Sequence, residues 1–376
     1  MPQPPIWLLA PDAFKGTLDA SEVAQGLCEG IKSARSDLVV QSLPMADGGE
    51  GTLAALHLAL GGTLTNVQVT SPYPEGIGRS VPWLLLPSGI AVVELASSAG
   101  LPLLEPVERD PLQTSTHPLG ELVDAVLDQG VSSLVIGLGG SATVDGGLGA
   151  LQALGAVLTR AGRRLDRPCT GGDLLELDAI DLKPLQARVA HLNLQLAVDV
   201  SNPLTGSSGA ARVFAPQKGA DDAAVERLEA GLKHVAQLLG DAGHGFGDGA
   251  AGGAGFGLRL GLGATVHAGA RFVAELIGLP EACQKASLVV TGEGCYDDQT
   301  EFGKVPFAVA DVAQAQGVPS ALVAGQIVRS PEALAGDPFS AHIALEGVSE
   351  EPEVGDLERL HRAGKRLVRL LGPPEG

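Results

Sequence analysis

Lysines and carboxylates recur in glycine-containing loops, each at the end of an apolar run that is typical of a strand. The first such loop, Asp12–Gly16, follows the run Ile6–Ala10 and precedes a predicted helix. Open α/β sheets bind ligands at the carboxyl ends of their strands. A lysine beside a glycine and a helix N-terminus suits a phosphate group. We therefore expect Lys15 to bind an anion. A single lysine in a turn would be interpreted as a surface residue, and the anion site is favoured here because similar loops recur later in the chain.

Acidic side chains occupy the equivalent position in later loops. They are Asp47, Glu50, Asp145, Asp199, Glu293 and Asp297. Each one alone is typical of a turn former or a helix N-cap. Together they supply what phosphoryl transfer requires, because carboxylates hold Mg²⁺ and accept a hydroxyl proton while glycine amides contact phosphate oxygens.

Two further lysines lie in glycine loops. Lys218 precedes Gly219, and we expect it to bind a substrate carboxylate or a phosphate, although a lysine there is also typical of a solvated turn. Lys304 follows Gly303, but Val305 stands where a P-loop needs a hydroxyl residue. The chain is therefore not a P-loop NTPase.

The glycines near residue 140 offer weaker support for a second interpretation, a dinucleotide-binding site. Gly137-x-Gly139-x-x-Ala142 follows a strand and matches a loose form of the dinucleotide fingerprint. A Rossmann unit also needs an acid at the end of the next strand, and none stands near Arg160. A nicotinamide-dependent dehydrogenase is thus a minor alternative. The motifs of serine hydrolases and protein kinases do not occur.

The elements around these loops alternate as strand, loop and helix. We predict strands near 6–10, 38–43, 64–70, 81–86, 90–95, 133–138, 194–198, 287–290 and 320–324, and helices near 52–60, 121–128, 148–158, 223–239, 305–316 and 359–371. A further helix of about 15 residues is predicted to begin after Asp19, which together with Glu22 resembles a capping box. The segment 243–263 holds ten glycines in its 21 residues, which suits backbone packing or, more simply, a flexible loop.

The chain of 376 residues is too long for one ordinary core, so we predict two α/β domains. The strands between 64 and 95 pair without intervening helices, which marks a sheet of another kind. A discontinuous parallel-sheet domain would comprise residues 1–62, 115–200 and 284–376. The second domain, with a mixed sheet, would comprise residues 63–114 and 201–283.

Composition excludes several classes of partner. The net charge of −19 repels a polyphosphate backbone, so we expect no nucleic acid partner. Cys28, Cys169, Cys283 and Cys295 form no C-x-x-C pair, which argues against a disulfide framework and a zinc site. Neither a signal peptide nor a membrane-spanning run occurs, so we expect a cytoplasmic protein. Since aromatic residues make up only 3%, the core should consist of Leu, Val and Ala.

Taken together, the loops resemble the bacterial type I glycerate kinase family, the glycerate 2-kinases. The resemblance rests on Asp12–Gly16, Pro44–Thr52, Gly139–Thr143, Asn202–Gly206, Pro216–Ala220 and Thr291–Gly294, and it runs from residue 6 to residue 326. It implies ATP- and Mg²⁺-dependent phosphorylation of (R)-glycerate to 2-phosphoglycerate. It also implies a flavodoxin-like, Rossmann-like domain and a second α/β domain likened to restriction-enzyme folds.

On the basis of this resemblance we form a hypothesis for the roles of the candidate residues. Lys15 would bind the glycerate carboxylate or the transferring phosphate, and Asp47 and Glu50 would act near Mg²⁺ or the substrate hydroxyls. Asp199 or Asp297 would be the base. The remaining expected residues are Gly139, Gly140 and Ser141 around the nucleotide phosphates, Asn202, Lys218, Glu293 and Lys304 in substrate or phosphate binding, and Asp47, Asp145 and Glu293 as metal ligands.

Four positions depart from the family's pattern. They are Ala13 in place of Ser, Val144 in place of Asn, Ser201 in place of Asp, and Cys295 in place of Arg. Arginine is permanently charged and binds carboxylates with two hydrogen bonds, and cysteine does neither. These departures leave open a kinase for another small hydroxy acid, or a non-catalytic relative that binds sugar acids. Independently of these positions, the sequence leaves open whether the chain forms a homodimer.

Overall fold

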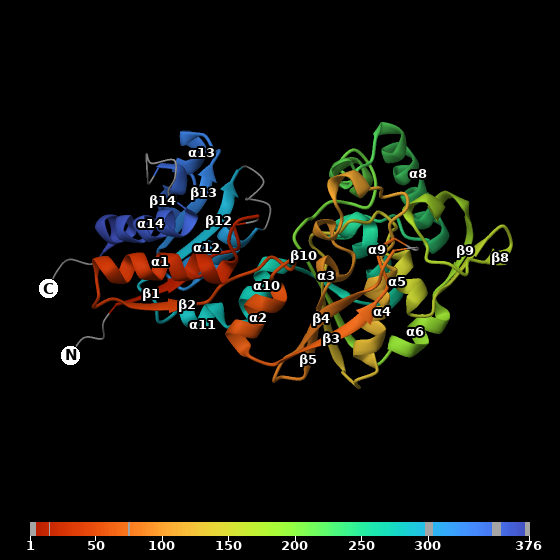
Figure 1. Ribbon diagram of the computed structural model, residues 1–376, viewed down its shortest axis with the longest axis horizontal. Coiled ribbons are helices and arrows are strands. Elements are labelled where there is room, and N and C mark those ends of the chain that lie inside the picture. The colour runs from red at the N-terminus through yellow and green to blue at the C-terminus, as the bar shows by residue number, and fades with distance from the viewer. Residues whose placement is uncertain (1–4, 15, 74–75, 298–303, 348–354, 373–376) are drawn as a thin grey trace. The chain divides into compact units, whose positions relative to one another are not determined.

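The computed structural model describes residues 5–14, 16–73, 76–297, 304–347 and 355–372 (Figure 1). Its contacts divide the chain into two compact units. Unit 1 comprises Met1–Asp47, Ala54–Ala59 and Ala270–Gly376, and unit 2 comprises Gly48–Leu53 and Leu60–Gly269. Both units are α/β structures. Within these described ranges, no helix is long and apolar enough to cross a membrane.

Unit 1 contains a five-stranded sheet in which every neighbouring pair is parallel. Its strands are β1 (Ile6–Leu9), β2 (Val39–Ser42), β12 (Leu288–Tyr296), β13 (Ser320–Ile327) and β14 (Phe339–Ala344). The spatial order is β14-β13-β12-β1-β2. Numbered within unit 1 alone this is 2-1-3-4-5, the flavodoxin order, and its switch point lies between β1 and β12.

The helices of unit 1 begin and end largely where the sequence predicts. They are α1 (Ala20–Ala34), α2 (Thr52–Leu60), α10 (Gly269–Leu276), α11 (Leu279–Cys283), α12 (Val305–Ala315), α13 (Pro331–Ala335) and α14 (Asp356–Leu371), with a 3₁₀ turn η6 (Leu345–Gly347). The capping box at α1 is confirmed. Asp19 Oδ1 accepts from the Glu22 N–H at 2.8 Å, and Glu22 Oε2 accepts from the Asp19 N–H at 2.9 Å.

The first and last helices of the described chain pack directly against each other in unit 1. In Figure 1 the red helix α1 lies beside the blue helix α14. Glycines allow the close approach, because a Cβ on Gly30 would lie 2.0 Å from the carbonyl oxygen of His361 and one on Gly364 would lie 2.5 Å from that of Leu27. The buried side chains of Leu27 and Leu360 belong to the same core cluster as those of β1 and β12.

Unit 2 contains a six-stranded mixed sheet with the order β11-β10-β6-β5-β4-β3. Its strands are β3 (Thr63–Val69), β4 (Arg79–Leu85), β5 (Ile90–Glu94), β6 (Ser133–Gly137), β10 (Asn193–Val198) and β11 (Thr265–Ala268). The β3–β4 and β4–β5 pairs are antiparallel, as the sequence predicts for a pairing without helices. The strands β5, β6, β10 and β11 run parallel, so their carboxyl ends share one edge.

Helices and a smaller sheet complete unit 2. The helices are α3 (Leu95–Ala99), α4 (His117–Leu127), α5 (Leu148–Ala153), α6 (Lys183–Val189), α7 (Ala210–Phe214), α8 (Asp222–Leu239) and α9 (Ala250–Leu262), and the 3₁₀ turns are η1 (Leu101–Leu103), η2 (Pro106–Glu108), η3 (Gly171–Glu176) and η4 (Pro216–Lys218). The antiparallel sheet comprises β7 (Val157–Arg160), β8 (Arg163–Arg164) and β9 (Leu177–Asp181). The helix predicted over 148–158 therefore ends early, since Gly155 has a φ of +113° and a strand follows.

The structure divides the chain differently from the division expected from the sequence. Residues 115–200 were expected with the parallel sheet of unit 1, but β6 pairs with β5 and β10 inside unit 2. The alternation of strands and helices identifies β6 as a buried parallel strand and does not say which sheet it joins. The later crossing falls at residue 270 rather than near 284.

The glycine-rich segment 243–263 packs backbone against backbone. Gly252, with a φ of +67°, would place a Cβ 2.0 Å from the carbonyl oxygen of Thr143. A Cβ on Gly257 would lie 2.1 Å from the carbonyl oxygen of Gly146. The Gly146 N–H in turn donates a hydrogen bond to Gly252 O at 3.1 Å. Of the two interpretations of this segment, backbone packing is therefore confirmed. These glycines pack against the loop of residues 139–147.

Candidate active site

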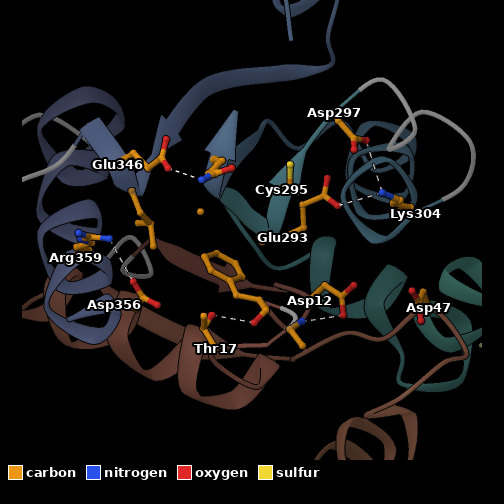
Figure 2. A pocket seen from close by; sticks show the side chains of 16 residues that line it. Asp12, Thr17, Asp47, Glu293, Cys295, Asp297, Lys304, Glu346, Asp356 and Arg359 are labelled. Atoms are coloured by element: carbon orange, nitrogen blue, oxygen red, sulfur yellow. Dashed lines mark hydrogen bonds and ion pairs between the residues drawn. The ribbon is translucent and has the colours of Figure 1, made fainter. Parts of the chain in front are cut away.

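A pocket with a volume of about 410 Å³ opens within unit 1 at the carboxyl ends of its parallel strands (Figure 2). Residues near the carboxyl ends of β1, β12 and β13, or just after them, line this pocket. The pocket spans the switch point between β1 and β12, where open α/β sheets bind ligands. Among the described lining residues, carboxylates outnumber cationic side chains. The pocket therefore suits a cation, either alone or bound to a phosphate group.

Lys304 lies between two carboxylates in this pocket. Its Nζ is 4.0 Å from Glu293 Oε2 and 3.7 Å from Asp297 Oδ1, and Figure 2 shows both side chains turned toward it. Glu293 is buried near the end of β12, while Lys304 precedes α12 and its side chain is 35% exposed. The structure therefore brings together three residues that the sequence predicts for the site.

Asp12 and Asp47 bring two more buried carboxylates to the pocket. Asp12 follows β1, and its N–H donates to Gly292 O of β12 at 2.8 Å. The Oδ1 atom of Asp12 accepts a hydrogen bond from the Ala13 N–H at 2.8 Å. Ala13, which stands where the family resemblance leads us to expect a serine, also lines the pocket. Asp47 follows β2 and is one of the residues expected from the sequence, whereas Asp12 is expected there only as the first residue of the loop Asp12–Gly16.

Cys295 stands in the pocket beside these carboxylates. The residue is exposed overall, but partial removal of its thiol from water, followed by the negative charges of Asp297 and Glu293, raises its pKa. The thiol form is therefore favoured, and this position offers a ligand neither a charge nor a bidentate hydrogen-bond donor.

The far end of the pocket holds residues that the sequence did not indicate. Gln326 Nε2 donates to Glu346 Oε1, and the Arg359 guanidinium lies 3.5 Å from Asp356 Oδ1. Glu346 follows β14, a strand absent from the sequence prediction, so the signal for it was missing. Arg359 begins the helix predicted over 359–371, and nothing in the sequence of that helix indicates that its first turn lines a pocket.

A buried polar network supports the end of β12. Tyr296 donates from its hydroxyl to Asp337 Oδ2 at 2.6 Å and accepts from Arg329 at 3.0 Å. Arg329 also donates to Asp337 Oδ1 at 2.8 Å, and its guanidinium lies over the Tyr296 ring. Burial and then the hydrogen bond to Asp337 raise the pKa of Tyr296. The network anchors the residue between Cys295 and Asp297.

The other predicted residues cluster in unit 2, around the loop that follows β6. Lys218 is 2% exposed and donates to Ser141 Oγ at 2.7 Å and to Thr143 O at 2.8 Å. Gly139 is needed because a Cβ there would lie 2.4 Å from the Cα of Gly49. Backbone packing thus accounts for a glycine of the apparent dinucleotide fingerprint.

Asp145 is an internal hydrogen-bond acceptor of this loop. Its Oδ2 accepts from the N–H and Oγ1 of Thr116, both at 2.7 Å, and its Oδ1 accepts from the Gly147 N–H at 3.1 Å. The residue is fully buried, which raises its pKa, while these bonds act in the opposite direction. Asp145 belongs to unit 2 and Asp47 and Glu293 to unit 1, and its oxygens are already engaged with protein donors.

Four predicted residues have other placements. Asp199 is half-buried just after β10, and Glu50 is exposed within the Gly48–Leu53 piece of unit 2. Asn202 shapes its own loop, because its Nδ2 donates to Ser208 O at 2.8 Å. Lys15 lies outside the described residues.

Comparisons with known proteins identify the family. A model of the glycerate kinase family matches residues 7–370. The chain is 40% identical over 326 residues to the glycerate 2-kinase of Escherichia coli (strain K12), with 85% of each chain covered. It is 41% identical over 337 residues to the glycerate kinase of Bacillus subtilis (strain 168), with 87% of this chain and 86% of the relative covered.

A solved structure agrees with the sequence relatives. The crystal structure of a protein from Salmonella typhimurium LT2 assigned as glycerate kinase 2 superposes with a TM-score of 0.83 at 35% identity, and 98% of both chains is covered. The similarity therefore extends through both units. The chain belongs to the glycerate kinase family and is a kinase.

Proposed function

We propose that this kinase transfers the γ-phosphoryl group of ATP to the 2-hydroxyl of (R)-glycerate and releases 2-phosphoglycerate and ADP. The observation that carries the proposal is the Lys304 ammonium, within 4.0 Å of Glu293 and 3.7 Å of Asp297 in a pocket at the switch point of the sheet. Phosphoryl transfer uses such a cation to balance developing charge and a carboxylate to orient the nucleophile.

The transfer is direct and in line, with no covalent enzyme intermediate. The glycerate 2-hydroxyl oxygen bonds to the γ-phosphorus as the bond from that phosphorus to the β,γ-bridging oxygen breaks. The hydroxyl proton passes to a carboxylate. Asp297 suits this role because it lies in the pocket beside Lys304, and Asp199 is the alternative base.

Magnesium fits the donor chemistry of the same pocket. Asp12, Asp47 and Glu293 present the carboxylate oxygens that Mg²⁺ prefers. Proteins usually hold Mg²⁺ through one or two carboxylates together with waters and phosphates. The described residues contain no group of three or more side chains placed to hold a metal ion by themselves, so waters and phosphate oxygens would have to complete its coordination. Bound Mg²⁺ would neutralise the β- and γ-phosphates.

An ADP-release assay with D-glycerate, with and without Mg²⁺, tests the proposal. We expect turnover that needs both, and a loss of kcat/KM on the order of 100-fold or more in Lys304→Met and Asp297→Asn. Asp199→Asn separates the two candidate bases. Glu275→Gln is the control, because Glu275 is an exposed residue of unit 1 whose ion-pair partner among the described residues is Arg271 on its own helix. Wild-type kcat/KM in both pocket variants would place the site elsewhere.

The position of phosphorylation needs its own measurement. In 2-phosphoglycerate the phosphorus couples to the single C2 proton, whereas in the 3-phosphate it couples to two C3 protons. Proton-coupled phosphorus NMR of the product should therefore show a doublet. A triplet would contradict transfer to the 2-hydroxyl while leaving the kinase activity intact.

A second candidate function is phosphorylation of another small hydroxy acid. Cys295 favours it, because it lines the pocket at the position where the family resemblance leads us to expect an arginine. Comparing kcat/KM across a panel of hydroxy acids, in the wild type and in Cys295→Arg, separates the candidates. A higher kcat/KM for an acid other than glycerate in the wild type would favour this second function.

A further inference from the structure

Lys218 is buried, which is unusual for a lysine. Its side chain, on the 3₁₀ turn η4, is 2% exposed and reaches the loop after β6. There Nζ donates to Ser141 Oγ at 2.7 Å and to Thr143 O at 2.8 Å. Removing an amine from water is unfavourable unless such bonds replace those to solvent. The lysine therefore fixes the positions of these two loop residues.

The bond from Lys218 determines what the Ser141 hydroxyl can do. A hydroxyl group has one hydrogen to donate and two lone pairs that accept. Lys218 occupies a lone pair, so the hydrogen of Ser141 is left to donate elsewhere. No acceptor for it is found among the residues that the structure describes. Ser141 keeps 6% of its surface exposed, and Gly140 beside it is exposed with a φ of +69°.

The loop that carries Ser141 is held from several sides. Asp145 accepts hydrogen bonds from Thr116, and the Gly146 N–H donates to Gly252 O of α9 at 3.1 Å. The Ala142 N–H also donates to Ala99 O at 2.9 Å. A hydroxyl on so well-held a loop, at the carboxyl end of a parallel strand, is preorganised to bind an anion.

We propose that Lys218 is a positioning residue that acts through Ser141, turning its hydroxyl outward as a hydrogen-bond donor to a phosphoryl group. The inference rests on the proposed function, in which phosphoryl groups enter on ATP and leave on 2-phosphoglycerate. Both sources present the same anionic oxygens. Lys218 itself, being buried behind Ser141, does not contact the ligand, in contrast to the role expected from the sequence.

The experiment measures dissociation constants of ADP and of 2-phosphoglycerate on the full chain by calorimetry. The variants are Ser141→Ala, Lys218→Met and the double variant, with Ser132→Ala, an exposed serine just before β6, as control. Loss of a hydrogen bond to a charged group should weaken binding roughly tenfold or more. We expect that loss in each single variant, no further loss in the double variant, and no change in the control.

The two ligands distinguish the sources. Weakening for ADP alone assigns the nucleotide phosphates, weakening for 2-phosphoglycerate alone assigns the product phosphate, and weakening for both assigns the transferring group; each supports the proposal. Unchanged affinity of Ser141→Ala for both ligands overturns it. So does an undiminished effect of Lys218→Met in the Ser141→Ala background, because a lysine that only stabilises the loop would act without the hydroxyl.

Two additional measurements keep the test decisive. If Lys218→Met does not fold, Lys218→Arg and Ser141→Thr replace it, and we expect Ser141→Thr to restore the affinity that Ser141→Ala loses. Glycerate turnover by the wild type is measured separately. A wild type that binds ADP through Ser141 but does not phosphorylate glycerate would contradict the proposed function and leave this inference standing.

Discussion

Lys304 and Lys218 place the same side chain in opposite surroundings. Lys304 is partly exposed and lies near two carboxylates, whereas Lys218 is buried among neutral hydrogen-bond partners. Burial lowers the pKa of Lys218 to about 7, and the charge of Asp145 opposes that change. Near neutral pH the two lysines therefore serve different purposes: one balances charge in a pocket, and the other orients a hydroxyl.

The lowered pKa of Lys218 makes a prediction about stability. Between its folded pKa of about 7 and its ordinary value of 10.5, the unfolded chain holds a proton that the folded chain has released. The free energy of unfolding of the wild type, relative to Lys218→Met, should therefore rise as the pH rises through this window. Below it, the unfavourable burial of a charged amine is fully present. Urea unfolding of both proteins at about pH 7 and about pH 9 measures the difference, and a difference independent of pH would contradict the assignment.

At the scale of elements, local signals were predictable and long-range pairings were not. The capping box of Asp19 and the helix Thr52–Leu60 follow from neighbouring residues and are found as expected. The membership of β6 in unit 2 depends on which partner strands it meets, and its run of apolar residues fits any parallel sheet. Likewise Glu293 could be recognised beside a strand, although β12 continues through it to Tyr296 instead of ending at residue 290. Glu346 could not be recognised, because β14, the strand before it, was missed even though its residues largely alternate between apolar and polar.

The crossing of α1 and α14 supplies a prediction at this scale. Gly30→Ala would place a Cβ 2.0 Å from the carbonyl oxygen of His361, so the helices must separate. We expect the free energy of unfolding to fall by about 2–3 kcal/mol, within the range for overpacked sites. Gly336→Ala is the matched control, since its Cβ would meet nothing closer than Ala333 O at 3.5 Å. Denaturant unfolding compares them, and equal stabilities would show that the crossing is not tightly packed.

At the scale of the whole molecule, charge sets the response to salt. The net charge of −19 means that like charges repel one another in the folded state. Added NaCl screens this repulsion, so we expect the melting temperature to rise by on the order of a few degrees between low and high salt. Choline chloride at equal ionic strength separates screening from specific sodium binding. A melting temperature that falls with both salts would show that attractive ion pairs dominate instead.

The interrupted course of unit 1 has a consequence for synthesis on the ribosome. β1, a central strand of its sheet, pairs with β12, whose first residue is Leu288, so the strand emerges long before its neighbour has been translated. Unit 2, which is nearly continuous from Leu60 to Gly269, is complete before then and is free to fold first. During that interval β1 keeps one edge open to pairing with other chains. Nascent chains truncated before Leu288 should therefore be the aggregation-prone species of this kinase.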